Sequence, residues 1–134
     1  MLHLSTRARY GLRAMIELAK APVGLPVLAE QISERQGLPR KYLHSILAAL
    51  KTAGLVRSVR GASGGYLLAR RAGSIRTLDV LEAMEGKLRI NPCVDDAGAC
   101  RRSRRCAART LYRELNRAMV EVLQRFTLQD LAKP

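Results

Sequence analysis

The sequence has no tryptophan, only one phenylalanine and no long apolar run. Its core must therefore be aliphatic, and the chain can supply one because 48% of its residues are hydrophobic. No segment approaches the roughly eighteen consecutive apolar residues that a membrane span needs. Arginines interrupt the N-terminal segment MLHLSTRARYGLRAM, so it lacks the apolar stretch of a secretory signal. We expect a cytoplasmic protein.

Acidic residues are also scarce. The 134-residue chain has 11 of them against 24 lysines and arginines, which gives a net charge of +13. Residues 35–76 contain nine basic residues and no acid, and residues 97–113 contain six arginines and no acid. Such one-sided charge causes self-repulsion, and nucleic acid is the partner that best offsets it. From the charge alone, a ribosomal protein or a merely solvated basic surface is the alternative interpretation.

Cysteine is rare and confined to one segment. Cys93, Cys100 and Cys106 follow the spacing C-x6-C-x5-C, with four arginines between the last two. In a reducing compartment, clustered cysteines bind metal or do redox work more often than they form disulfides. The spacing suits zinc poorly because it contains no close C-x2-C pair. Three unliganded thiols are a further alternative. A thiol redox enzyme usually needs a C-x-x-C pair or a neighbouring histidine, so we expect no enzyme activity.

Apolar periodicity and turn residues predict a mainly helical chain with one β-hairpin. Helices are expected at residues 5–20, 27–36, 39–51, 77–86 and 107–126, and strands at 55–59 and 66–70. A glycine-containing turn joins the second and third helices, as in a helix-turn-helix. The hairpin that follows, with the tip RGASGG, is placed like the wing of a winged helix. We therefore expect a winged helix-turn-helix DNA-binding domain and then a second part, divided as residues 1–76 and 77–134.

The sequence also predicts how some of these helices are used. In the second helix, Leu28 and Ile32 are expected to point inward, and Thr77 is expected to cap the helix that begins there. The second part should hold a cysteine loop at residues 92–106 and a long C-terminal helix. Too little chain is left to cover that helix, so a partner helix from a second subunit can bury its apolar stripe. That stripe consists of Leu111, Leu115, Ala118, Met119, Val122 and Phe126.

This order of parts resembles the Rrf2 family of winged-helix repressors, which is typified by the iron–sulfur regulators IscR, NsrR and RirA. The resemblance covers nearly the whole chain. It is carried by LSTRARYGLRAM, LAEQISERQGLPRKYLHSILAALKTAGLVRSVRGASGGYLLAR, TLDVLEAMEG and the three-cysteine loop. The wing stretch GLVRSVRGASGGYLLAR is its most specific piece. The resemblance implies a winged DNA-binding domain and a homodimer joined through the long C-terminal dimerisation helix.

The resemblance also implies which residues meet double-stranded DNA. The helix from Pro39 to Lys51 would lie in the major groove, with its first turn at the base edges. The wing would approach the minor groove, and a two-fold dimer predicts a pseudo-palindromic operator. The candidate DNA-binding residues are Ser5, Thr6, Arg7, Arg40, Lys41, Tyr42, His44, Lys51, Arg57, Arg60, Gly64 and Gly65.

For the cysteines, the resemblance implies an iron–sulfur cluster with two or four irons on Cys93, Cys100 and Cys106. The fourth ligand is not apparent from the sequence. Arg109 stands where IscR has a histidine, and Arg9 stands where NsrR has an aspartate. Water or a small thiol can complete such a cluster, as can a side chain of this chain, for which the open candidates are Asp95, Asp96, Glu114 and His3.

Together these features predict a dimeric, sequence-specific DNA-binding transcriptional regulator. It would sense iron, redox state or nitric oxide through a cluster on its three cysteines. A cluster-free member of the same family, with the cysteines acting as a thiol redox switch, is the strongest alternative. An RNA-binding or ribosome-associated winged helix explains the charge but leaves the clustered thiols without a role.

Overall fold

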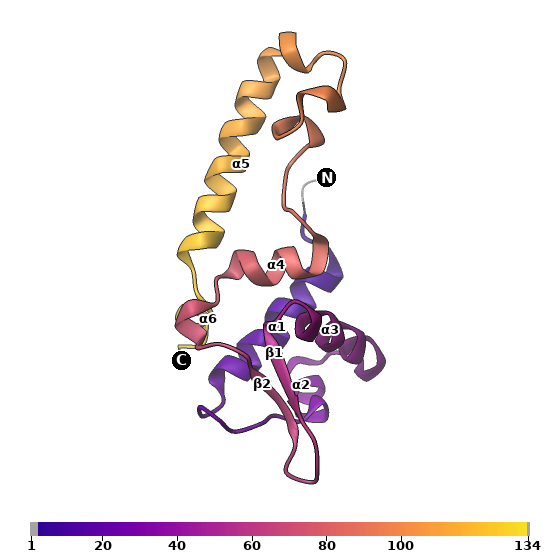
Figure 1. Ribbon diagram of the computed structural model, residues 1–134, viewed down its shortest axis with the longest axis vertical. Coiled ribbons are helices and arrows are strands. Elements are labelled where there is room, and N and C mark those ends of the chain that lie inside the picture. The colour runs from indigo at the N-terminus through magenta and orange to yellow at the C-terminus, as the bar shows by residue number, and fades with distance from the viewer. Residues whose placement is uncertain (1–2, 134) are drawn as a thin grey trace.

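A head and an arm make up the molecule (Figure 1). The computed structural model describes residues 3–133. The head consists of α1 (Thr6–Lys20), α2 (Ala29–Gln36), α3 (Arg40–Thr52), β1 (Val56–Val59), β2 (Gly65–Leu68) and α4 (Thr77–Glu85). The arm is α5 (Ala107–Arg125), and α6 (Leu128–Leu131) returns the chain to the head. Short 3-10 helices complete the chain at η1 (Ala72–Ser74), η2 (Pro92–Val94), η3 (Ala97–Ala99) and η4 (Ser103–Arg105). The predicted fold class, mainly helical with a hairpin wing, is confirmed.

The core of the head is aliphatic, as the shortage of aromatic residues requires. Met15 of α1 and Ile32 of α2 are fully buried. α1 begins after Ser5, whose hydroxyl accepts a hydrogen bond from the Ala8 N–H at 3.0 Å, and α2 ends at Gly37 in the left-handed region. The predicted stripe of α3 recurs at helical spacing and is also fully buried: Leu43, Ile46, Leu47 and Leu50.

A third extended segment, consisting only of Val27, pairs with the two-stranded hairpin. β1 and β2 pair antiparallel, and Val27 pairs with Tyr66 of β2 through reciprocal backbone hydrogen bonds of 2.8 and 2.9 Å. The predicted helix at residue 27 is therefore wrong at its start, because the open edge of β2 offers backbone partners that a helix would leave unused. Leu28, expected inward, is 42% exposed and occupies the N-cap position of α2, where its N–H donates to Gln31 Oε1 at 3.0 Å.

Thr77 joins the head to the arm. Its N–H donates to the Phe126 carbonyl at 2.9 Å, and its hydroxyl donates to the Leu123 carbonyl at 2.6 Å. The predicted cap at Thr77 is therefore wrong, because this hydroxyl is used at the end of α5. Arg76 is the N-cap of α4, and its N–H donates to the Asp79 carboxylate at 2.9 Å.

The short helix α6 is an element that the sequence did not predict. It places Leu128 fully inside the core, and the Leu128 N–H donates to the Ile75 carbonyl at 3.0 Å. Thr127 caps this helix, with its hydroxyl accepting from the Asp130 N–H at 3.3 Å. α6 therefore anchors the far end of the arm on the head.

α5 is apolar on two sides but contains no fully buried residue. Met119, Val120 and Leu123 pack against the core of the head. The predicted stripe lies largely on the other side, where Leu111, Leu115, Val122 and Phe126 are exposed. This exposed row is called the α5 stripe below. Among the described residues, no helix has the length and hydropathy that would let it cross a membrane.

Candidate nucleic-acid interface and cysteine loop

The N-terminal turn of α3 presents positive charge to solvent. Lys41 and His44 are exposed, and the exposed Arg40 pairs with Glu30 of α2. The first turn of α3 contains no acidic residue, and Pro39 before it provides no side-chain cap. The first backbone N–H groups of α3 therefore lack intrahelical partners at the positive end of the helix dipole, which favours a phosphate.

Aromatic packing fixes this turn against α1. The half-buried Tyr42 meets Tyr10 edge to face, with ring centroids 5.7 Å apart. The Arg13 guanidinium carbon lies 5.7 Å from the centre of the Tyr10 ring, and Arg13 Nε donates to Gln36 Oε1 at 3.1 Å. The ring of Tyr42 therefore orients α3.

The start of α1 brings one predicted residue beside α3. The Arg7 guanidinium donates to Ser45 Oγ on α3 at 3.2 Å. Thr6 is exposed and accepts from Arg9 at 3.2 Å. Ser5, besides capping α1, donates its N–H to Glu85 Oε1 at 2.8 Å. Arg7 and Thr6 thus present side chains near the surface, whereas Ser5 is engaged in holding α1 and α4.

The wing is joined to the end of α3 by Lys51, whose Nζ donates to Ser58 Oγ of β1 at 2.8 Å. Arg60 is exposed in the turn that follows β1. Side chains alternate along a strand, so Arg57 lies on the face of the hairpin opposite Ser58. The structure therefore connects Arg7, α3 and the Lys51–Ser58 pair along one surface, and it places Arg57 on another.

Gly64 and Gly65 are required by the hairpin itself. A Cβ atom on Gly64 would lie 2.2 Å from the Val59 carbonyl oxygen, and one on Gly65 would lie 2.5 Å from the Val27 carbonyl oxygen. Gly65 also has a φ of 138°, which other residues rarely adopt. The close approach of these glycines is therefore to neighbouring backbone within the fold.

Sequence reasoning missed two residues of this surface, Ser45 and Arg13. Ser45 is the partner of Arg7, and Arg13 links Tyr10 to the end of α2. A signal for Arg13 was present, because Arg7, Tyr10 and Arg13 recur at every third position and so lie on neighbouring parts of one helix side. Ser45 carried no comparable signal.

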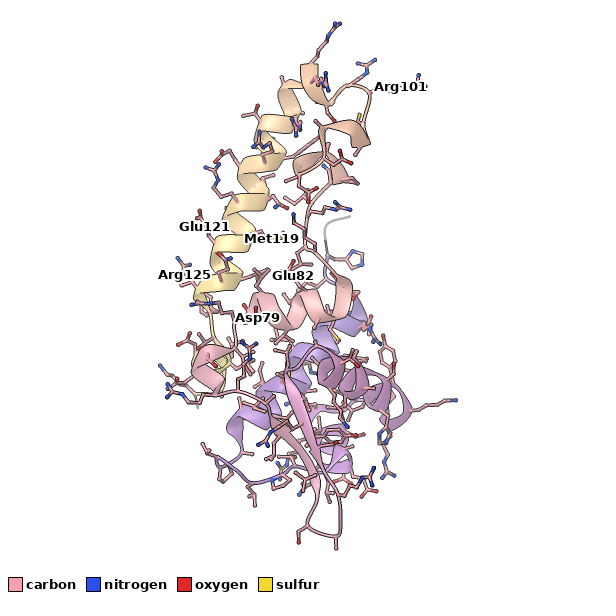
Figure 2. The ribbon with its side chains drawn as sticks, in the orientation of Figure 1. Asp79, Glu82, Arg101, Met119, Glu121 and Arg125 are labelled. Carbon is pink, nitrogen blue, oxygen red and sulfur yellow. The ribbon has the colours of Figure 1, made fainter. Side chains whose placement is uncertain are left out.

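The cysteine loop lies beside the N-terminal end of α5, far from α3 (Figure 1). Cys93 lies in η2, Cys100 follows η3, and Cys106 is the N-cap of α5. All three thiols are free; Cys100 is exposed and the other two are half-buried. Figure 2 shows Arg101 of this loop at the end of the molecule opposite the wing.

Side chains of α5 hold the beginning of the loop by its backbone. Arg109 Nε donates to the Cys93 carbonyl at 2.6 Å, and Asn116 Oδ1 accepts from the Ile90 N–H at 2.9 Å. Arg109 therefore positions the backbone of the first cysteine.

Three of the candidate fourth ligands already form ion pairs or hydrogen bonds with neighbouring residues. Asp95 pairs with Lys87 at 2.9 Å and Arg89 at 3.0 Å, and these hydrogen bonds hold the pKa of its carboxyl below the ordinary value. Asp96 accepts from the Gly98 N–H at 2.8 Å, and Glu114 pairs with Arg117 at 3.6 Å. These carboxylates therefore have local partners.

The donor types of the loop fit an iron–sulfur cluster, but their arrangement in this conformation does not. Three cysteine thiols on one loop suit such a cluster. The Ser103 hydroxyl, between Cys100 and Cys106, is buried without a hydrogen-bond partner among the described residues. Within residues 3–133, however, no three histidine, cysteine, aspartate or glutamate side chains are grouped so that they could hold a metal ion. The loop would have to rearrange to bring its thiols together.

Comparison with known proteins gives matches along almost the whole chain. The sequence profile of the Rrf2 family, described as an iron-dependent transcriptional regulator, matches residues 4–134. The protein rrf2 of Nitratidesulfovibrio vulgaris is 37% identical over 132 residues, which span 98% of this chain and 88% of that protein.

Solved structures agree with this match. CymR of B. subtilis, described as the global cysteine regulator, superposes with a TM-score of 0.83 at 36% identity, covering 98% of this chain and 97% of CymR. IscR of T. potens superposes with a TM-score of 0.80 at 36% identity, covering 97% of this chain and 85% of that chain. The fold and the sequence therefore point to the same group of proteins.

Proposed function

The chain belongs to the Rrf2 family of transcriptional regulators, and from this membership we propose that it is a homodimer that binds a pseudo-palindromic operator and responds to a signal at its cysteines. The family binds DNA, and the related proteins are regulators rather than enzymes. We assign DNA reading to residues 1–76, and sensing and dimerisation to residues 77–134. Because the proposed operator is chromosomal DNA, the protein would act in the cytoplasm.

The surface formed by α3 and the wing is the observation that carries the DNA-binding proposal. The uncapped, basic start of α3 would enter the major groove, with Lys41 and His44 free to reach base edges and Arg40 able to exchange Glu30 for a phosphate or guanine. Lys51 and Arg60 would follow the backbone and the minor groove, where a narrow groove attracts arginine.

Salt dependence of binding tests this proposal. If the dimer neutralises about six to ten phosphates, a plot of log affinity against log salt has a slope of about −5 to −9. We expect that slope for operator duplex, and weaker binding to double-stranded RNA of the same sequence at equal salt. A flat salt response, or a preference for RNA, would contradict the proposal.

The α5 stripe supports the homodimer. It is a row of exposed apolar side chains at helical spacing, on a face of α5 that the other described residues leave uncovered. Two such rows from two copies would bury each other. Each Å² of apolar surface removed from water in this way would stabilise the dimer by about 25 cal/mol. The two-fold axis that results would repeat the α3 surface for the two halves of an operator.

For the signal, the proposal is that Cys93, Cys100 and Cys106 hold an iron–sulfur cluster, which would supply chemistry sensitive to iron, redox state or nitric oxide. The description of the family as iron-dependent supports it. Arg109 holds the backbone of Cys93 to α5, so a change in the loop would be transmitted to that helix. The exposed arginines around Cys100 would offset the negative charge of the thiolates.

A cluster-free thiol switch is the second candidate. The structure favours it in one respect, because the described residues contain no preformed metal-binding group. CymR, described as a cysteine regulator, also has the same fold. In this version, oxidation or modification of the exposed Cys100 would alter the loop without metal.

Anaerobic purification separates the two candidates. Iron, acid-labile sulfide, visible absorption and the native mass of the dimer would be measured on one sample. Coloured protein with stoichiometric iron and sulfide supports the cluster, and colourless protein that resists reconstitution supports the thiol switch. In either case, replacing all three cysteines by serine should abolish the regulated change in operator affinity; a response that survives would contradict sensing by the cysteine loop.

A further inference from the structure

A hollow that none of the functions above uses lies beside the outer face of the wing. It encloses about 740 Å³ between the end of α1, the loop of residues 21–25, β2, η1 and α6. Its walls are mainly aliphatic and include Leu18, Leu67 and Leu68. Small-molecule sites typically enclose about 300–1,000 Å³ and are lined mostly by apolar groups with a few polar ones, and this hollow has the same size and character.

The hollow opens on the side of the hairpin that faces away from α3. Ser58 points toward α3, because Lys51 binds its hydroxyl. Its neighbour Arg57 and the opposed residue Leu67 lie on the other face, and both line the hollow. Ligands of the hollow and the major-groove surface of α3 would therefore occupy different faces of the head.

The charge around the hollow has one sign. Arg57, Arg70 and Arg71 line it, and no acidic residue does so among the described residues. Arg70 pairs with Asp79 outside the hollow at 3.9 Å, and 49% of the Arg70 side chain and 39% of the Asp79 side chain are exposed. Such a weakly held guanidinium can turn toward a stronger partner, and guanidinium groups bind carboxylate, sulfonate and phosphate groups through paired hydrogen bonds.

One edge of the hollow exposes apolar side chains to water. Val23 has 106% of its reference area exposed and Leu25 has 56%, and both belong to the loop of residues 21–25. Apolar residues that gather beside a hollow commonly mark a place where a ligand or partner binds. Here they continue the aliphatic wall that begins with Leu18 in the interior.

We propose that this hollow binds a small amphipathic organic anion. Its apolar body would lie against Leu18, Val23 and Leu67, and its acidic group would meet the arginines of the rim. A neutral apolar molecule would leave the positive charge unpaired, and a simple inorganic anion would leave the aliphatic walls in contact with water. The proposal does not depend on the operator or on the cysteine loop.

The test uses the full chain and the fluorescent anion 8-anilinonaphthalene-1-sulfonate. We expect saturable binding of one dye per protomer, with enhanced emission. The double variant Arg57→Gln, Arg71→Gln should weaken dye affinity at least tenfold, and Val23→Ser should weaken it several-fold without threatening the fold, because that side chain is fully exposed. N-phenyl-1-naphthylamine, which lacks the sulfonate, should bind at least tenfold more weakly than the anion.

Two control variants locate the binding. Arg101→Gln removes the same charge at the opposite end of the molecule, and Val59→Ser removes an exposed valine outside the hollow. Both should retain wild-type dye affinity. Non-saturable binding, equal affinity for the neutral dye, or equal losses in the control and hollow variants would each overturn the proposal.

Discussion

At the scale of single residues, two wing glycines differ in how strictly the fold requires them. Gly61 and Gly65 both have positive φ, at 105° and 138°. A Cβ on Gly61 would meet nothing within 4 Å, whereas one on Gly65 would collide with the Val27 carbonyl. Gly61→Ala should therefore cost only the left-handed strain, about 1–2 kcal/mol, and Gly65→Ala should cost more than about 3 kcal/mol in unfolding free energy.

Urea unfolding at one fixed protomer concentration would measure both glycine variants, since the stability of the proposed dimer would depend on concentration. Gly61→Ala is the control, because it changes the same residue type in the same hairpin. Equal losses in the two variants would mean that the wing rearranges around residue 65 and that Val27 is not fixed by its pairing with β2.

Lys51 tests the assignment of a phosphate contact. Its ammonium group is held by Ser58 at the meeting point of α3 and the wing. Lys51→Ala should weaken operator and non-specific duplexes by the same factor and reduce the magnitude of the salt slope by about one per lost contact. Lys133→Ala removes the same charge beside α6 and should leave both quantities unchanged. A loss restricted to the operator would instead make Lys51 a base-reading residue.

At the scale of elements, the α5 stripe predicts how the molecule assembles. Leu115→Glu should convert the dimer to a monomer, because a carboxylate placed between two apolar helices loses its hydration without gaining a partner. Sedimentation velocity at micromolar concentration would measure the change. Gln124→Glu adds the same charge to an exposed position of α5 outside the stripe and should remain dimeric. A dimeric Leu115→Glu would place the interface elsewhere.

The elements that could be predicted are those whose signal is local. Periodicity located α1, α3 and α5, and the buried stripe of α3 was predicted residue by residue. The extended Val27, the role of Thr77 and the helix α6 escaped prediction because each depends on backbone partners distant in sequence. In the same way, cysteine spacing identified the loop, but the bond from Arg109 to the Cys93 carbonyl required a fold.

At the scale of the whole molecule, the arrangement raises the question of how a signal travels. The cysteine loop and α3 lie far apart in Figure 1, and α5 runs between the loop and the head. The N-terminal part of α5 holds the loop through Arg109, and its C-terminal part is tied to α4 by the two hydrogen bonds of Thr77. Within one protomer, Thr77 is therefore one point where movement of α5 reaches the head, beside the apolar contacts of Met119, Val120 and Leu123.

Thr77→Val keeps the shape of this side chain and removes its hydrogen bond to the Leu123 carbonyl. The loss should cost about 1–3 kcal/mol of stability, because that carbonyl is left without its partner. We also expect operator affinity to become less sensitive to alkylation of the cysteines, measured as the ratio of affinities before and after treatment with N-ethylmaleimide. Thr110→Val, at an exposed position of α5, should keep the wild-type ratio. If Thr77→Val keeps the wild-type ratio as well, the Thr77 hydroxyl does not carry the signal.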